Sequence, residues 1–285
     1  MMNNHLKGLL IAFFGILVLA PEGILVKLAN ADSFTVLFWR GIFFTISILV
    51  ILLLSYRSRT LDEIKGIGKK GIFLGFLTGF GGATFILAIH YTSLAKTLVI
   101  ISAAPLMVAL VSFILLGEKP RLFTWLAMLI VFTGIYVVMS GDTSGLNLKG
   151  SLFALASVTT GGFSFTLLRK YKEVNMVPAM AVNGLFITLI GLLFAESLTL
   201  SSQSMNYIII SSILVAISFT LITIAPRFIP APEVAIFFPM GTVIGTFLAW
   251  LILKEELSSN AIYGGVVVIL TLFIHSIYSA RQSKN

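Results

Sequence analysis

Residues 88–120 of the chain read AIHYTSLAKTLVIISAAPLMVALVSFILLGEKP. Within this stretch, residues 97–116 carry no charge, and a helix needs about 20 mostly apolar residues to cross the hydrocarbon core of a membrane. Pro105 lies inside the run, where a proline removes a backbone donor and bends a helix. The stretch therefore predicts a bent transmembrane helix that ends at Gly117 and Glu118.

Nine further runs of similar length fill the rest of the chain, which is 58% hydrophobic and only 11% charged. Barrel strands are about 9–11 residues long and alternate in polarity, and no run here alternates. The predicted fold class is thus an all-α integral membrane protein with ten transmembrane helices. The predicted spans are residues 9–29, 34–54, 71–91, 97–116, 123–139, 151–168, 177–196, 207–228, 235–253 and 261–278.

The remaining composition excludes several classes of site. The chain has no cysteine and three scattered histidines, so we expect no disulfide, no metal site and no cofactor. Residues 66–71, GIGKKG, lack the spacing and the hydroxyl of a phosphate-binding loop. We therefore expect transport, if any, to be driven by an ion gradient or by exchange and not by ATP.

Lys and Arg residues predict how the spans are oriented. If the N-terminus is cytoplasmic, 14 of the 19 Lys and Arg residues lie on the inner side, 4 lie on the outer side, and Arg40 lies within a helix. Such a bias is typical of cytoplasmic loops. It predicts a multi-pass protein of the cell (inner) membrane with both termini cytoplasmic. Basic residues placed next to anionic lipid also argue against a nucleic-acid partner.

The two halves of the chain resemble each other at offsets of 137–143 residues. The matched pairs are residues 7–8 with 149–150, 40–45 with 183–188, and 115–118 with 252–255. The chain thus divides into five-helix repeats at 1–145 and 146–285. Because five is odd, the second repeat must be inverted, as in secondary transporters that bind substrate between their repeats.

Several stretches resemble one known family. They are APEGILVK at 20–27, FWRG at 38–41, the stretch 88–120, and APEVAIFFP with FLAWLILKEELS within 231–258. Together they resemble the EamA-type branch of the drug/metabolite transporter (DMT) superfamily over nearly the whole chain. The resemblance implies a secondary transporter. Lys96 and Gly241 depart from residues common in the family, so the resemblance leaves the cargo open among amino acids, other metabolites, choline-type solutes and nucleotide sugars.

Glu22 and Arg40 are the main candidates for a substrate site. A charge at the centre of a membrane helix costs about 2.5–3.5 kcal/mol on insertion scales, so such residues are functional candidates. At about 1.5 Å per residue, both lie roughly 10 Å below the outer boundary, on consecutive helices. We expect them to pair and to meet an ammonium and a carboxylate of the cargo, with Glu22 also a proton-coupling candidate. The alternative is a purely structural ion pair. Their counterparts in the second repeat are Ser164 and Asn183, which are polar but neutral.

Four other residues are candidates for the cavity wall. Lys96 and His90 stand near outer helix ends, where the alternatives are a snorkelling lysine and an interfacial histidine. Trp39 and Phe237 are candidates for a cation–π wall. Glu255 recurs where the first repeat has an acidic residue, and we expect it to shape the turn after helix nine, with a gate as the alternative.

The predicted function is secondary active transport of a small polar organic metabolite, such as an amino acid or amine, by alternating access. Export is favoured, and the coupling partner is a proton or a counter-substrate. The alternatives are an importer or exchanger of a cationic or zwitterionic metabolite, an intramembrane enzyme, and a membrane scaffold without transport. We expect no enzymatic activity, membrane lipid as the surroundings, and a monomer or weak dimer.

Overall fold

The computed structural model describes residues 4–117, 122–140, 145–229, 234, 237–255 and 258–282, and the secondary structure within these ranges is helical. Ten membrane-crossing segments account for most of it, which confirms the predicted fold class. In the first half they are α1 (Asn4–Leu19) with α2 (Glu22–Ala29), α3 (Ser33–Tyr56), α5 (Gly68–Tyr91), α6 (Leu94–Ile101) with α7 (Ala104–Leu116), and α8 (Leu122–Ser140). In the second half they are α9 (Gly145–Lys170), α10 (Ala179–Phe194), α11 (Ser202–Ile224), α13 (Phe238–Leu248) with a π-helix (Ala249–Leu253), and α14 (Ser259–Gln282).

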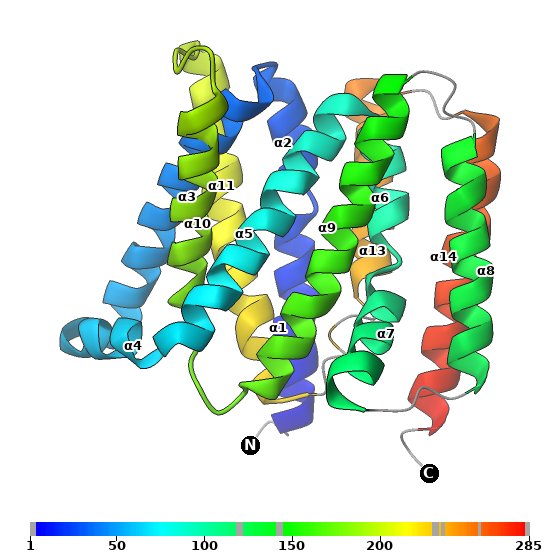
Figure 1. Cartoon of the computed structure of the whole chain (residues 1–285), viewed down its shortest axis with the longest axis horizontal. Coiled ribbons are helices and arrows are strands. Elements are labelled where there is room, and N and C mark those ends of the chain that lie inside the picture. The colour runs from blue at the N-terminus through cyan, green and yellow to red at the C-terminus, as the bar shows by residue number, and fades with distance from the viewer. Residues whose placement is uncertain are drawn as a thin grey trace.

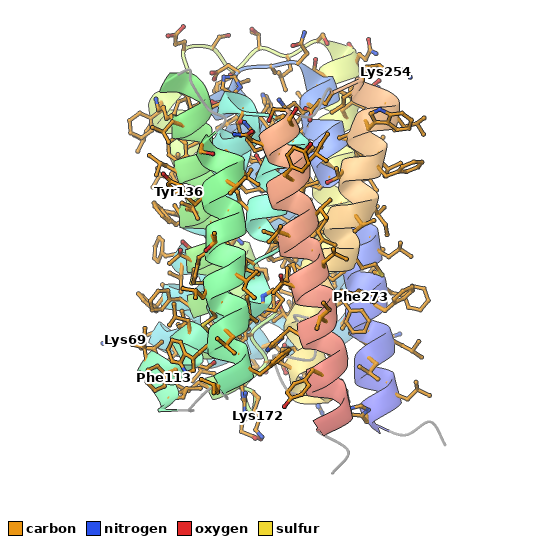
Figure 2. All side chains as sticks on the ribbon, turned by 90° about the vertical axis from the view of Figure 1, so that its right-hand side faces the viewer. Lys69, Phe113, Tyr136, Lys172, Lys254 and Phe273 are labelled. Atoms are coloured by element: carbon orange, nitrogen blue, oxygen red, sulfur yellow. The ribbon has the colours of Figure 1, made fainter. Side chains whose placement is uncertain are left out.

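The outer surface of the bundle is suited to lipid. Six of the segments are long and apolar enough to cross a membrane, and the other four are shorter apolar helices. Large apolar side chains such as Tyr136 and Phe273 point away from the bundle, with 72% and 65% of their surface exposed (Figure 2). Charged side chains gather at the two ends, with Lys69 and Lys172 at one end and Lys254 at the other (Figure 2).

The two halves run in opposite directions. Both ends of the chain lie at one end of the bundle, which we call the termini end, and Lys254 marks the opposite or far end (Figures 1 and 2). Helix α1 starts at the termini end, whereas α9, its counterpart in the second half, starts at the far end (Figure 1). The short helix α4 (Thr60–Gly66) lies across the termini end. The halves are therefore inverted.

The helix pairs follow the symmetry that an inverted repeat requires. Helices α3 and α10 are equivalent and pack together, as do α8 and α14. The pair of α1 with α11 is equivalent to the pair of α9 with α5, and both are present. Exchanging the two halves thus turns each of these helix pairs into itself or into another pair that is present. The halves are therefore interleaved and not merely placed side by side.

Two glycines bring α3 and α10 together at the symmetry axis. A Cβ atom on Gly41 would lie 2.6 Å from the carbonyl oxygen of Gly184, and one on Gly184 would lie 2.9 Å from that of Gly41. Small residues allow such close backbone approach between membrane helices. Gly41 and Gly184 also occupy matching positions in the sequence repeat, so the two copies of one motif contact each other.

Breaks within two of the crossing segments shape the interior. The chain leaves α1 at Ala20 and enters α2 after Pro21, and α6 is separated from α7 by Ser102 and Ala103. Pro105, which predicted a bend, lies in the first turn of α7, where the missing donor costs nothing. These breaks leave room between the halves.

Candidate functional site

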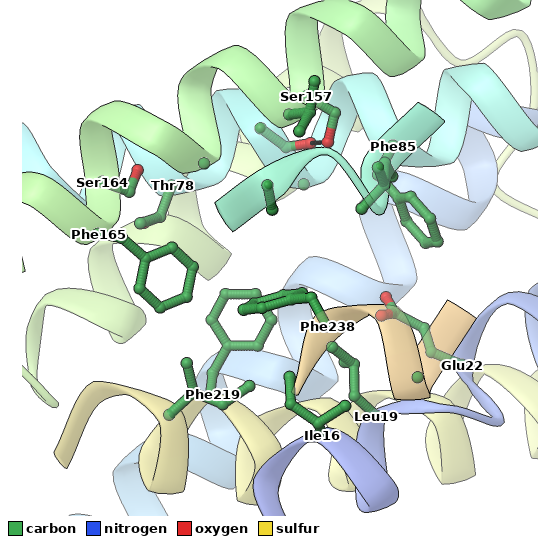
Figure 3. Close-up of a pocket in the computed structure, with 18 of the residues that line it drawn as sticks. Ile16, Leu19, Glu22, Thr78, Phe85, Ser157, Ser164, Phe165, Phe219 and Phe238 are labelled. Carbon is green, nitrogen blue, oxygen red and sulfur yellow. Dashed lines mark hydrogen bonds between the residues drawn. The ribbon is translucent and has the colours of Figure 1, made fainter. Parts of the chain in front are cut away.

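A cavity of about 180 Å³ lies between the two halves. The first half contributes walls from α1, α2, α3, α5, α6 and α7, and the second half contributes walls from α9, α10, α11 and α13. Helices α8 and α14 do not line it. Figure 3 shows Glu22 at one end of this cavity and Ser164 with Phe165 at the other. The cavity thus has one charged end and one that is aromatic and hydroxyl-bearing.

The break after α1 positions Glu22. It is the first residue of α2 and follows Pro21, so its carboxylate lies in the first turn of a helix, where the helix dipole favours negative charge. Only 5% of Glu22 is exposed, and one carboxylate oxygen accepts a hydrogen bond from Nη2 of Arg40. Burial of a carboxylate is tolerated when it is paired and hydrogen-bonded in this way. The predicted pairing of Glu22 with Arg40 is confirmed.

Arg40 projects from α3 and is 3% exposed. A guanidinium has five N–H donors, and the Glu22 contact uses one of them. Within the described ranges, the Nε–H group of Arg40 has no hydrogen-bond acceptor. A buried donor without a protein acceptor is costly, so the Arg40 side chain has hydrogen-bonding capacity left for an anionic group in the cavity.

The rest of the wall is mainly apolar. The rings of Phe165 and Phe238 meet edge to face at 5.3 Å, and Phe85 and Phe219 add further aromatic surface. Ser164 donates its hydroxyl proton to the carbonyl oxygen of Thr160, at 2.9 Å. The Ser164 hydroxyl oxygen keeps its capacity to accept a hydrogen bond, whereas the phenylalanines suit the apolar part of a solute.

Comparison with known proteins decides the family. The EamA-like transporter family matches residues 6–140 and matches again at residues 148–277. The chain belongs to the EamA-like transporter family. It is thus an EamA family transporter of the DMT superfamily, and the resemblance seen in the sequence is confirmed.

The relatives of this EamA family transporter carry the same general description. One is an uncharacterized transporter of Methanothermobacter thermautotrophicus, 24% identical over 70% of this chain, and the match spans only 59% of that relative. Another is the uncharacterized transporter YetK of Bacillus subtilis, 23% identical over 94% of this chain and 86% of its own length. A crystal structure of a protein that is 17% identical superposes with a TM-score of 0.70, covering 97% of this chain and 98% of that one, which shows the shared fold.

Three of the predicted site residues of the EamA family transporter line the cavity, namely Glu22, Arg40 and Ser164. The other five lie outside its wall, and two of them are aromatic. Trp39 donates from Nε1 to the carbonyl oxygen of Leu198, at 2.8 Å, so its indole holds the loop between α10 and α11. Phe237 packs edge-on against a ring of α1, and its neighbour Phe238 lines the cavity instead.

The remaining three are polar. Asn183 is 3% exposed and lies on α10 where it packs against α5; its Oδ1 atom has no donor within the described part of the chain. Lys96 is 7% exposed in the first turn of α6, and its backbone N–H donates to Ser93 Oγ at 3.2 Å. His90 is exposed at the far end of α5 and contacts the ring of Tyr91. Helix phase explains these placements, because neighbours in sequence point about 100° apart around a helix.

The sequence analysis missed one contact between the halves of the transporter. The carboxylate of Glu255, which follows the π-helix, accepts hydrogen bonds from the first two backbone N–H groups of α6, at 3.1 and 3.2 Å. It also lies 3.9 Å from Nζ of Lys27, at the end of α2. The sequence did carry a signal for this contact, namely an acidic residue at the same place in both repeats. Its first-half counterpart, Glu118, lies outside the described residues.

Proposed function

We propose that this EamA family transporter carries a small zwitterionic solute such as an amino acid, and alternatively a simple amine, through the cavity between its halves. The observation that carries the proposal is the buried Glu22–Arg40 pair in the wall of an otherwise apolar cavity. Isolated charges are too costly to keep in a membrane interior without a purpose or a partner. Here the two charges neutralise each other until a solute arrives.

A zwitterion matches this arrangement because it carries both complementary charges. Its ammonium would bind the Glu22 carboxylate and its carboxylate would bind the Arg40 guanidinium, so one ion pair is replaced by two and no charge is left unpaired. A solute with one charge can satisfy only one of the two side chains. The volume also limits the cargo, since an apolar cavity of about 150 Å³ accommodates benzene and this one measures about 180 Å³.

Alternating access suits an inverted repeat. Because the two halves are related by an axis within the membrane plane, exchanging their conformations turns the cavity from one side of the membrane to the other. In this scheme the protein lies in the cytoplasmic membrane, with the termini and the basic residues near Lys69 and Lys172 on the cytoplasmic side. The cargo is exported, and a proton taken up by Glu22 would free Arg40 and couple the cycle to a proton gradient.

Transport in liposomes tests the proposal. Purified protein is reconstituted and assayed for uptake of labelled amino acids and amines, with and without a pH gradient. We expect Glu22→Gln to abolish uptake without lowering the amount of folded protein, because the amide cannot pair with an ammonium or carry the proton. Glu196→Gln, in an exposed loop, is the matched control and should transport normally. Normal transport by Glu22→Gln would show that the Glu22–Arg40 pair is only a structural contact.

A further inference from the structure

Gly161 is an unusual point in the cavity wall. Helix α9 presents one face to the cavity over about three turns, and Gly161 lies near the middle of that face. Figure 3 shows Ser157 before it and Ser164 and Phe165 after it along the same wall. Apart from its chain neighbours and the backbone of its own helix, a Cβ atom on Gly161 would meet no heavy atom of the described chain within 4 Å. The space beside Gly161 is therefore open cavity.

No packing contact of the described chain accounts for a glycine at this position. Glycine destabilises the interior of a helix relative to alanine, so it is normally retained for close packing or for a left-handed backbone. Gly162, the next residue, shows the packing case, because its Cβ would lie 2.7 Å from Cγ of Met107. Gly161 has neither a near neighbour nor a positive φ angle. What the missing side chain provides is space.

The other glycines of the cavity wall differ from Gly161. Each is close enough to a neighbouring side chain that an added Cβ would touch or displace it. These glycines and the side chains they meet are Gly23 with Leu94, Gly81 with Thr160, Gly82 with Ile187, and Gly241 with Ile16. Among the wall glycines, only at Gly161 would a side chain grow into the cavity without first meeting the protein.

We propose that Gly161 is a specificity-determining residue that sets the upper size limit of the transported solute. This inference rests on the proposed function and adds a selectivity rule to it. A methyl group is about as large as a water molecule, whose share of liquid volume is about 30 Å³. Valine would add one CH and two methyl groups to the wall of a cavity that measures only about 180 Å³. A larger side chain at position 161 excludes large solutes before small ones.

The absence of cysteine from the sequence permits a direct test. In Gly161→Cys the only thiol lies in the cavity wall, and the protein folds before the larger groups are attached to it. Methyl, butyl and benzyl methanethiosulfonate then convert the thiolate to a mixed disulfide and release methanesulfinate, which adds groups of increasing size. Dithiothreitol reverses the change. The probes are two labelled series, namely alanine, leucine and phenylalanine, and ethylamine, butylamine and phenethylamine.

We expect uptake of the largest carried member of a series to fall about tenfold or more relative to the smallest, because the attached group overpacks the space that the largest solute needs. The loss should grow with the attached group and disappear after reduction. Gly66→Cys is the matched control. By the same measure, a Cβ atom on Gly66 would meet no heavy atom within 4 Å, but Gly66 lies on the exposed helix α4. The same reagents should not change its uptake ratios.

Two results would overturn the inference while leaving transport intact. One is modification of Gly161→Cys with no change in the ratio of large to small solutes. The other is a Gly161→Cys protein that transports normally but whose thiol reacts with none of the reagents. Failure of the proposed function is a distinct result, because the unsubstituted protein would then move neither series. Equal melting temperatures before and after modification show that any loss comes from the cavity and not from unfolding.

Discussion

Replacement of Glu255 by glutamine is expected to open the far end of the transporter. The Glu255 carboxylate connects the second half to the start of α6 in the first half through two backbone N–H bonds, and it lies 3.9 Å from Nζ of Lys27. The amide of glutamine offers one acceptor oxygen, so one N–H group loses its acceptor and the remaining bond loses its ionic character. The ion pair is lost as well.

The contacts give the size of the effect. A hydrogen bond to a charged group contributes about 1.5–3 kcal/mol, whereas a partly exposed ion pair contributes less than about 1 kcal/mol. Lys27 and Glu255 side chains are 28% and 15% exposed, so the ion pair is the smaller part. The expected loss is about 2 kcal/mol, which corresponds to roughly a thirtyfold shift toward states in which this contact is broken.

Thiol labelling measures this shift. Gly161→Cys is labelled from the far side with a membrane-impermeant maleimide in vesicles of known orientation, with and without Glu255→Gln. We expect labelling to become faster by one to two powers of ten, because the broken contact no longer holds that end closed. Glu196→Gln, an exposed residue of the same end, is the control and should leave the rate unchanged. A lower melting temperature with an unchanged labelling rate would refute the reasoning and make Glu255 a helix cap only.

Two further predictions concern stability, both measured by unfolding in mixed micelles. Arg40→Gln should lower the free energy of unfolding by about 3–5 kcal/mol, because it leaves the Glu22 carboxylate buried without a partner. Adding Glu22→Gln should recover most of that loss, and a double variant no more stable than Arg40→Gln would contradict this account. Gly41→Val should sharply reduce the folded yield, because even its Cβ would lie 2.6 Å from the backbone oxygen of Gly184. Normal yield and stability of that variant would show that α3 and α10 can separate without cost.

The transmembrane segments could be predicted because one strong physical constraint governs them. Every crossing must be apolar over a known length, so the run predicted at 71–91 ends at the same residue as Gly68–Tyr91. The same counting placed Glu22 and Arg40 at similar heights on consecutive helices, and the structure shows them paired. Segment length and the relative height of residues are encoded in the chain even where the fold brings distant segments together.

The direction in which each side chain points could not be predicted in the same way. In a soluble helix the polar face marks the outside, but lipid and protein interior are equally apolar, so that signal is missing here. Trp39 was therefore assigned to the cavity on its adjacency to Arg40, although its indole reaches Leu198. Phe237 and Phe238 are equally plausible by sequence, and only Phe238 lines the cavity.

Symmetry in the backbone coexists with asymmetry in the charge. Gly41 and Gly184 are equivalent and meet at the axis, so the packing that a rocking motion would use is the same in both halves. Glu22 and Ser164 are also equivalent in the repeat and both line the cavity, yet only one of them is charged. Under the proposed function, a solute bound at the Glu22 end would have a defined orientation, with its charged groups toward the first half and its remaining atoms toward α9. The backbone that would move the cavity can be symmetric while the residues that would select the cargo are not. We therefore expect the residues of α9, Gly161 among them, to set the size limit of the cargo.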